Sequence, residues 1–433
     1  MNKFTPINPD DAGDLTLFVD SADNRLKFKG HTGDVREIDM SRVEPVPIPV
    51  PVPTPTASGV ALNILDHTDS GKDIFLAIIG YQGDQWPTDI NSDFSYMNAD
   101  GSVSVCASGQ TFEDFSFNLK DMASGVTLPY FSSGRITISF DKKITSPPIN
   151  GGNQIINPSV LNQNDLNYNT IWGMMEFSNQ LKPPTDTTVC NIDTTLVDGF
   201  TFPIALTLVG GTFGVQTAGG MTASRDDLIA SFEKLPKAFT DQILYDPSGN
   251  FVRISSPALG VTGGVVPFPS DYLDNYITST WNHYASGTGN VLTFEIPLTV
   301  SIPVSGTVNA ENVFEFTDAN GETYNIPKPS TSDVLGCQGV FVGLNTNDGI
   351  VKRIVGAALN RGVLQNGTGF CDASTFYKTE PVNEYAKLVH QLSVSGTNYA
   401  FSYDDVCSMY SSDIADGMPT SLTIDLQVWP DVC

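Results

Sequence analysis

Basic side chains are scarce in this chain of 433 residues, where 22 lysines and arginines stand against 48 aspartates and glutamates, a formal net charge of −26. Contacts with phosphate groups need local positive charge, so this balance disfavours nucleic acid and anionic membranes as partners. No apolar run approaches the roughly 20 residues that a membrane-spanning helix needs. We therefore expect no nucleic-acid partner and no membrane insertion.

Residues that bind metals or carry redox chemistry are also few. The four histidines show no metal-ligand spacing, and the six cysteines form no C-x-x-C pair. This pattern argues against a histidine-based metal centre, a zinc ribbon and thioredoxin-like chemistry. We expect neither a metal nor another cofactor, and the wide cysteine spacing leaves any disulfide pairing open. The cysteines are Cys106, Cys190, Cys337, Cys371, Cys407 and Cys433.

Sequence signals for export and for common catalytic machinery are missing as well. Residues 1–13 contain no basic segment followed by an apolar one, so a cleaved secretion signal is not indicated. We expect an extracellular or virion-associated location reached by another route. The chain also has no G-x-S-x-G, no H-E-x-x-H, no phosphate-binding loop and no dinucleotide fingerprint in a strand-to-helix context.

Turn-forming residues are abundant, with 38 glycines and 28 prolines, while charged residues make up only 16%. From residue 58 onward, short apolar or alternating segments separated by Gly, Asn and Asp predict β-strands. An all-β sandwich is the natural first expectation. The predicted strands include 60–65, 74–79, 135–140, 202–208, 399–403 and 421–429.

A proline-rich stretch, residues 44–57, separates a short N-terminal module from the rest. Prolines alternate there with Val, Ile and Thr, which favours a stiff polyproline II spacer of about 3 Å per residue. Residues 1–43 alternate apolar and polar side chains in three short segments, which predicts a small β module. A sheet of three short strands is only marginally stable alone. We therefore expect this module to trimerise or dock on a larger particle. It resembles the particle-anchoring heads of phage or viral fibre proteins.

Helical periodicity appears in the middle of the chain. Ser224 and Ser270 precede apolar residues at helical spacing, and similar patterns run through 350–359 and 385–389. These helices predict a mixed α/β subdomain, residues 223–394. The predicted sandwich then comprises residues 58–222 and 395–433.

Carboxylates in apolar surroundings are the main candidates for chemistry. Period-two alternation places Trp172, Met174 and Glu176 on one strand face, and a buried glutamate there would have the raised pKa of a general acid. Asp193 and Asp198 follow in a second apolar stretch. Each has a simpler explanation, because an isolated strand glutamate is usually solvated and Asp-Gly is usually a turn.

Several segments resemble glycoside hydrolase family 64, the laminaripentaose-producing β-1,3-glucanases. They occur in the same order as in that family over about residues 60–429, and some also look like plant thaumatin-like proteins. The resemblance implies a thaumatin-like β-sandwich beside a mixed α/β subdomain, with an acidic cleft between them, and an endo-type β-1,3-glucan hydrolase acting on laminarin or curdlan. The segments are 128–140, 170–178, 196–200, 268–277, 357–361, 383–390 and 399–407.

The family's catalytic glutamate and aspartate correspond to Glu176 and Asp198. Because family enzymes invert the anomeric carbon, the resemblance implies Glu176 as general acid and Asp198 as general base, about 6.5–9.5 Å apart. Ser178, Gln180 and Gly199 replace the family's Thr, Asn and Phe. The segment 179–190 also looks like a lengthened loop with a Pro-Pro pair.

Other residues are candidates for substrate binding, with alternatives that the sequence leaves open. Trp172 can stack on a sugar ring, although a core role is the stronger expectation. Asp404 and Asp405 either line the cleft or hold a strand end. Ser178, Gln180 and Asp193 complete the candidate set, Arg135 is expected to pair with a carboxylate, and His390 to lie in the core.

Two other functions compete with hydrolysis. A virion or fibre component could use the same groove to attach to glucan without cutting it, and the anchor and spacer suit particle association in either case. A thaumatin-like inhibitor is less favoured, because that group depends on a dense disulfide framework and this chain has six cysteines.

Overall fold

The computed structural model divides the chain into two compact units, Met1–Thr56 and Ala57–Cys433. In the smaller unit, three antiparallel strands lie where the alternating pattern predicts them: β1 (Thr16–Asp20), β2 (Arg25–Lys29) and β3 (Val35–Glu37). The proline-rich residues 44–57 lie outside the described residues. Besides these three strands, the structure describes residues 59–82, 94–149, 158–160, 162–182, 187–263, 266–297, 300–343, 346–367 and 369–429.

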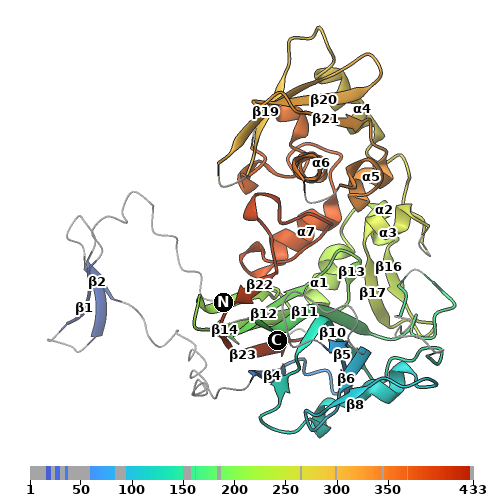
Figure 1. Cartoon of the computed structure of the whole chain (residues 1–433), viewed down its shortest axis with the longest axis vertical. Coiled ribbons are helices and arrows are strands. Elements are labelled where there is room, and N and C mark those ends of the chain that lie inside the picture. The colour runs from blue at the N-terminus through green and yellow to red at the C-terminus, as the bar shows by residue number, and fades with distance from the viewer. Residues whose placement is uncertain are drawn as a thin grey trace. The chain divides into compact units, whose positions relative to one another are not determined.

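The larger unit contains two extended sheets at one end (Figure 1). The first sheet has the order β22-β12-β11-β10-β5-β6-β7, and β8 also pairs with β5. All its pairs are antiparallel. Its strands are β5 (Ile74–Gln82), β6 (Phe94–Met97), β7 (Val103–Val105), β8 (Ser116–Asn118), β10 (Phe131–Phe140), β11 (Trp172–Lys182), β12 (Thr187–Thr194) and β22 (Ile414–Asp416).

The second sheet has the order β15-β14-β23-β4-β9, in which β23 and β4 are parallel. This pairing joins the last strand of the chain to the first strand of the unit, so the sheet closes only when both ends of the unit are present. Its strands are β4 (Val60–Asp66), β9 (Thr127–Leu128), β14 (Ile204–Gly210), β15 (Gly214–Gly219) and β23 (Pro419–Leu426).

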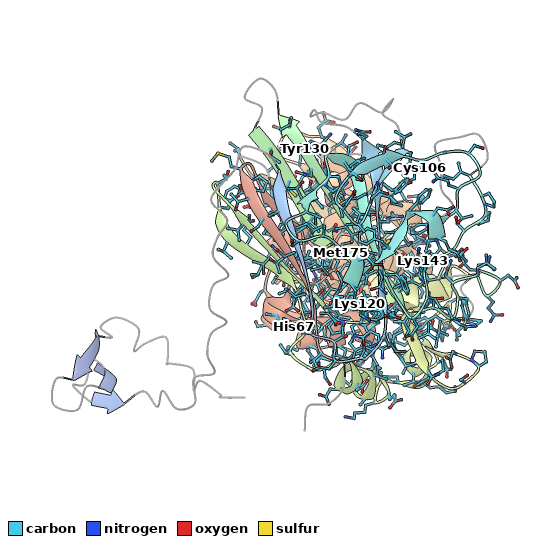
Figure 2. The ribbon with its side chains drawn as sticks, turned by 90° about the horizontal axis from the view of Figure 1, so that it is seen from below. His67, Cys106, Lys120, Tyr130, Lys143 and Met175 are labelled. Carbon is cyan, nitrogen blue, oxygen red and sulfur yellow. A yellow bond between two sulfur atoms is a disulfide. The ribbon has the colours of Figure 1, made fainter. Side chains whose placement is uncertain are left out.

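One hydrophobic core joins the two sheets. Alternate residues of β10 and β11 contribute Ile136, Ile138 and Met175 to it, and β14 and β23 contribute apolar residues from the other side. Figure 2 looks at this end of the unit and shows Met175 among the strands, where it has no exposed surface. The ring of Trp429 lies 4.4 Å from that of Phe140 and extends the same core.

The rest of the larger unit mixes helices with two small sheets around a second core (Figure 1). One sheet has the order β13-β17-β16 and the other β18-β19-β20-β21. The helices are α1 (Arg225–Phe232), α2 (Lys237–Thr240), α3 (Pro257–Val261), α4 (Asp274–His283), α5 (Thr331–Gly336), α6 (Asn347–Asn360) and α7 (Glu384–Leu392). The strands are β13 (Gly199–Phe200), β16 (Ile243–Tyr245), β17 (Phe251–Ser255), β18 (Leu292–Ile296), β19 (Ile302–Val308), β20 (Val313–Asp318) and β21 (Thr323–Pro327).

Short 3-10 helices connect several of these elements. They are η3 (Phe112–Phe115), η4 (Leu119–Asp121), η5 (Gly339–Phe341), η6 (Leu364–Asn366), η7 (Ala373–Thr375), η8 (Val394–Gly396) and η9 (Val406–Ser408). In the parts of the chain that the structure describes, no helix is both long and apolar enough to cross a membrane.

The helical predictions are confirmed. Ser224 caps α1 by accepting the Asp227 N–H, as predicted. Ser270 caps no helix, because α4 begins only at Asp274, and its N-cap Leu273 makes no side-chain cap bond. One strand expectation was wrong, because residues 399–403 form a turn. In the segment expected as a lengthened loop, residues 179–182 and 187–190 belong to the paired strands β11 and β12, and the Pro-Pro pair lies outside the described residues.

Candidate active site

Three charged side chains lie side by side across three neighbouring strands. The antiparallel registers pair Arg135 of β10 with Glu176 of β11, and Glu176 with Asp193 of β12. Residues opposed in this way share a face and have Cβ atoms about 4.5–5.5 Å apart. Arg135 Nη2 donates a hydrogen bond to Glu176 Oε1 at 2.6 Å, so Arg135 pairs with a carboxylate as predicted.

Alternation along β11 determines the face on which Glu176 lies. Its neighbours Met175 and Phe177 belong to the core between the two sheets. Successive strand residues point to opposite faces, so Glu176 points away from that core, and 52% of its side chain is exposed. Trp172 and Met174 pack in a separate cluster on the same outer face, which confirms the predicted grouping.

A β-bulge aims Arg135 at this face. Between Ser132 and Arg135 the register of β10 against β5 shifts by one residue, and Ser133 has a φ of 49°. A bulge changes which face the following residues occupy. Gly134 is also required, because a Cβ atom there would lie 2.5 Å from the Phe177 ring.

Asp193 is a partly buried carboxyl group beside Glu176. Burial raises its pKa to about 7, with further contributions from the negative charges of Glu176 and Asp413. Asp413 immediately precedes β22, next to β12, and burial raises its pKa too, with Asp405 adding to the shift. The site is therefore a cluster of carboxyl groups from several segments, in which few can be ionised without repulsion.

Asp198 lines a neighbouring pocket at the start of β13. The pocket also contains Trp172 and Arg253. Burial raises the pKa of Asp198, the charge of Glu176 raises it further, and Arg135 opposes the shift. As a whole residue, Asp198 remains exposed to solvent. Trp172 and Met174, which also line this pocket, lie on the same face of β11 as Glu176, so Glu176 and Asp198 border one site.

Gly199 holds the backbone next to Asp198. Its φ is +152°, and a Cβ atom there would lie 2.2 Å from the Ile254 carbonyl oxygen of β17. Glycine avoids this clash with the backbone. The Ser256 N–H also donates to the Asp198 carbonyl at 3.0 Å, so the main chain that carries the carboxylate is fixed on both sides.

Trp172 is largely buried, which fits the expected core role better than the alternative of stacking on a sugar ring. Trp172 also lines the Asp198 pocket. It is 8% exposed, and the Arg253 guanidinium lies 5.6 Å from its ring. Arg253 Nη2 donates to the carbonyls of Tyr168 and Thr170, at 2.7 and 3.1 Å. Arg253 therefore links the segment ahead of β11 to β17 behind the pocket.

Two residues implied by the resemblance differ in accessibility. Ser178 Oγ donates to Gln180 Oε1 at 3.1 Å. Ser178 is partly exposed on the face of Glu176, whereas Gln180 has no exposed surface. Gln180 is enclosed in this conformation, so the prediction of a direct substrate contact does not fit it.

The neighbours Asp404 and Asp405 are placed differently. Asp404 has no exposed surface and pairs with His390 Nε2 at 2.7 Å and with Arg361 Nη2 at 3.3 Å. The prediction of substrate contact is therefore wrong for Asp404, because its carboxylate is enclosed by these partners. Asp405 is exposed, and its negative charge helps raise the pKa of Asp413. His390 is buried, as predicted.

Sequence reasoning missed Asp413, Arg253 and the disulfide. Neither Asp413 nor Arg253 is in a local motif, and only the pairing of distant strands brings them to the site. The disulfide joins Cys371 to Cys407, two residues after Asp405. In the described parts of the chain Cys106, Cys190 and Cys337 are free, and no cluster of His, Cys, Asp or Glu is arranged to hold a metal ion.

The family model of glycoside hydrolase family 64, described as β-1,3-glucanase, matches residues 58–426. The chain belongs to this family. Two glucan endo-1,3-β-glucosidases are similar in sequence: one from Arthrobacter sp. (strain YCWD3) is 29% identical over 304 residues, and one from Cellulosimicrobium cellulans is 28% identical. Each alignment covers 68% of this chain and 52% of the relative, so the chain spans about half the length of these relatives.

Solved family 64 structures have the same fold. A laminaripentaose-producing β-1,3-glucanase in complex with laminaritetraose superposes with a TM-score of 0.72 at 23% identity, covering 85% of this chain and 98% of that one. A family 64 β-1,3-glucanase domain from Clostridium beijerinckii gives 0.69 at 25% identity, covering 87% and 100%. The mainly β architecture expected from the sequence is therefore the family 64 fold.

Proposed function

We propose that the chain is an endo-acting β-1,3-glucan hydrolase that inverts the anomeric carbon. The observation that carries this proposal is that Asp198 lines a pocket with Trp172 and Met174, which lie on the same face of β11 as Glu176. Glu176 and Asp198 are the two carboxylates implied by the family resemblance. Membership of family 64 and the two related glucan endo-1,3-β-glucosidases support the reaction class. The laminaritetraose bound to the related glucanase supports a β-1,3-glucan of the laminarin or curdlan type as substrate.

In this mechanism Glu176 donates a proton to the glycosidic oxygen as the bond to the anomeric carbon breaks. Asp198 accepts a proton from a water molecule that attacks this carbon from the opposite face. The two roles suit their surroundings. Glu176 is exposed on the sheet, where it can reach a substrate oxygen, and Asp198 lies in the adjoining pocket beside the apolar face of Trp172. The reaction needs no cofactor, since the two carboxyl groups transfer both protons.

The finer architecture follows from the same proposal. We infer that the two extended sheets form a thaumatin-like sandwich and that the glucan lies in a wide acidic cleft between it and the mixed subdomain. Ser178, Asp193 and Asp405 would contact substrate hydroxyl groups there. A neutral polysaccharide is not repelled by a chain of net charge −26, which suits this surface.

The test is product release from laminarin and curdlan by wild type, Glu176→Gln and Asp198→Asn. We expect short oligosaccharides from wild type and at least a hundredfold slower release from both variants, with glucan binding retained. Glu315→Gln, an exposed strand glutamate on β20, is the matched control and should keep wild-type activity. Wild-type levels of release by either active-site variant would contradict the proposal.

The N-terminal unit favours a second, compatible proposal about location. We propose that residues 1–43 attach the enzyme to a virion or another extracellular particle, because they form a unit separate from Ala57–Cys433. The competing function, glucan attachment without cleavage, predicts binding to curdlan but no product. Light scattering on the full chain tests the anchor: a trimer supports self-association through this unit, and a monomer that binds no particle opposes it.

A further inference from the structure

The row formed by Arg135, Glu176 and Asp193 poses a problem for the proposed general acid. Arg135 Nη2 donates to Glu176 Oε1 at 2.6 Å, so this carboxyl oxygen accepts a hydrogen bond from a guanidinium that has only donors. A general acid must instead carry a proton when the substrate binds. The proton therefore needs a second place in the site, close to Glu176 and away from Arg135.

Asp193 is in that place. It lies opposite Glu176 on β12, so Glu176 separates it from Arg135 on β10. We propose that Asp193 is the proton partner of Glu176: the two carboxyl groups hold one proton between them, and Asp193 supplies it to Glu176 during the reaction. The inference rests on the proposed function and adds a positioning residue to it.

The groups that face Asp193 favour its neutral form. Glu176 lies on one side, and Asp413, just ahead of β22, lies on the other. Asp405 adds negative charge behind Asp413, and the Tyr399 phenol interacts with the same three aspartates. The charged groups next to Asp193 are thus both acidic, and Arg135 is already paired with Glu176. Burial acts in the same direction and raises the pKa of Asp193 to about 7.

The proton transfers balance over one turnover. Glu176 gives a proton to the leaving glycosidic oxygen, and Asp193 passes its proton to Glu176, directly or through one water molecule, since Glu176 is exposed. Asp198 takes a proton from the attacking water, whose oxygen forms the new bond to the anomeric carbon. Asp198 then releases its proton to solvent, and solvent returns one to Asp193. The net reaction consumes one water molecule and one glycosidic bond.

The coupled pair predicts a specific change in pH dependence. In wild type, activity falls on the alkaline side as the shared proton is lost. In Asp193→Asn no second carboxyl group shares the proton, and Glu176 must carry it beside the positive charge of Arg135. The alkaline limb of kcat/KM should therefore move to lower pH, with activity near pH 7 falling about tenfold for each pH unit of the shift. The loss of activity should be smallest at the acidic end of the profile.

The experiment measures kcat/KM for laminarihexaose from pH 4 to pH 8 for wild type, Asp193→Asn and Asp193→Glu, with circular dichroism spectra as a check on folding. The expected result is a shifted alkaline limb in Asp193→Asn and a limb close to wild type in Asp193→Glu, which retains a titratable carboxyl. A loss by the same factor at every pH, or an unchanged profile, would overturn the inference. Full activity of Glu176→Gln would instead overturn the proposed function.

Discussion

His390 Nε2 lies 2.7 Å from Asp404 Oδ2, and both side chains are buried. Arg361 also pairs with Asp404, while Tyr377 Oη lies 3.0 Å from His390 Nδ1. The next residue along the chain, Asp405, is exposed beside the acidic cluster. The buried network therefore fixes the backbone that presents Asp405, and the two consecutive aspartates should respond differently to substitution.

Asp404→Asn is expected to reduce the free energy of unfolding by about 3–5 kcal/mol, because it leaves the buried Arg361 without its counter-ion. Asp405→Asn should change stability by less than about 0.5 kcal/mol, because its side chain is exposed, while weakening glucan binding. Urea denaturation and calorimetric titration with laminarihexaose measure the two effects. Equal stabilities of the two variants would show that Asp404 does not hold this loop.

Stability should depend on pH through Asp193. Folding raises the pKa of its carboxyl group to about 7, from about 3.9 in an unfolded chain. The folded state therefore binds this proton more tightly, and the stabilisation present below pH 4 is lost as pH rises to about 7. Asp193→Asn removes this loss, so the variant should be about 1–3 kcal/mol more stable than wild type at pH 7.5 and nearly equal to it at pH 4.

Denaturation of wild type and Asp193→Asn at four pH values between 4 and 7.5 measures this difference. Asp121→Asn, an exposed surface change, is the control and should give no pH-dependent gap. A gap of constant size across the range would mean that packing or hydrogen bonding, and not titration, causes the difference.

Gly199→Ala should disrupt the site without changing any charge. The new Cβ atom would lie 2.2 Å from the Ile254 carbonyl oxygen, so β13 must move from β17 and carry Asp198 with it. We expect a loss of at least tenfold in kcat/KM, since small displacements of catalytic groups slow reactions strongly. Gly287→Ala is the matched control, because Gly287 also has a positive φ but has open space around it. Similar activities of the two variants would contradict the role of Gly199.

The disulfide should stabilise the loop that contains Asp405. Cys371 and Cys407 are 36 residues apart, and closing a loop of this size stabilises a protein by about 2–4 kcal/mol. The double variant Cys371→Ser/Cys407→Ser should lose stability by this amount and show a raised KM, with Cys106→Ser as the control. If the double variant matches Cys106→Ser in thermal unfolding and in KM, the disulfide contributes to neither property.

Local patterns predicted much of the fold. Apolar or alternating segments located β4, β5, β10 and β23, and helical spacing located α1, α6 and α7, because burial leaves a pattern in the sequence. Residues 399–403 gave a wrong strand prediction for the same reason. Phe401 is buried, but Tyr403 has a φ of 66° and the backbone turns there. An apolar pattern records burial and cannot show a left-handed turn at a tyrosine.

The candidate site was predictable only in part. Glu176 and Asp198 lie in motifs that resemble the family, and alternation gives the outward face of Glu176. Asp413 and Arg253 come from segments more than 50 residues away from those motifs along the chain, and their place depends on strand pairing across the whole unit. The same applies to Asp404, whose burial depends on Arg361 and His390 rather than on its own neighbours in sequence.

Proton NMR during hydrolysis of laminarihexaose tests the inverting mechanism by following the anomeric configuration of new chain ends. An inverting mechanism with Glu176 as acid and Asp198 as base predicts that the α-anomer appears first and then converts to the equilibrium mixture, and that Glu176→Gln and Asp198→Asn give no comparable signal. Initial formation of the β-anomer, or wild-type rates in either variant, would contradict the account.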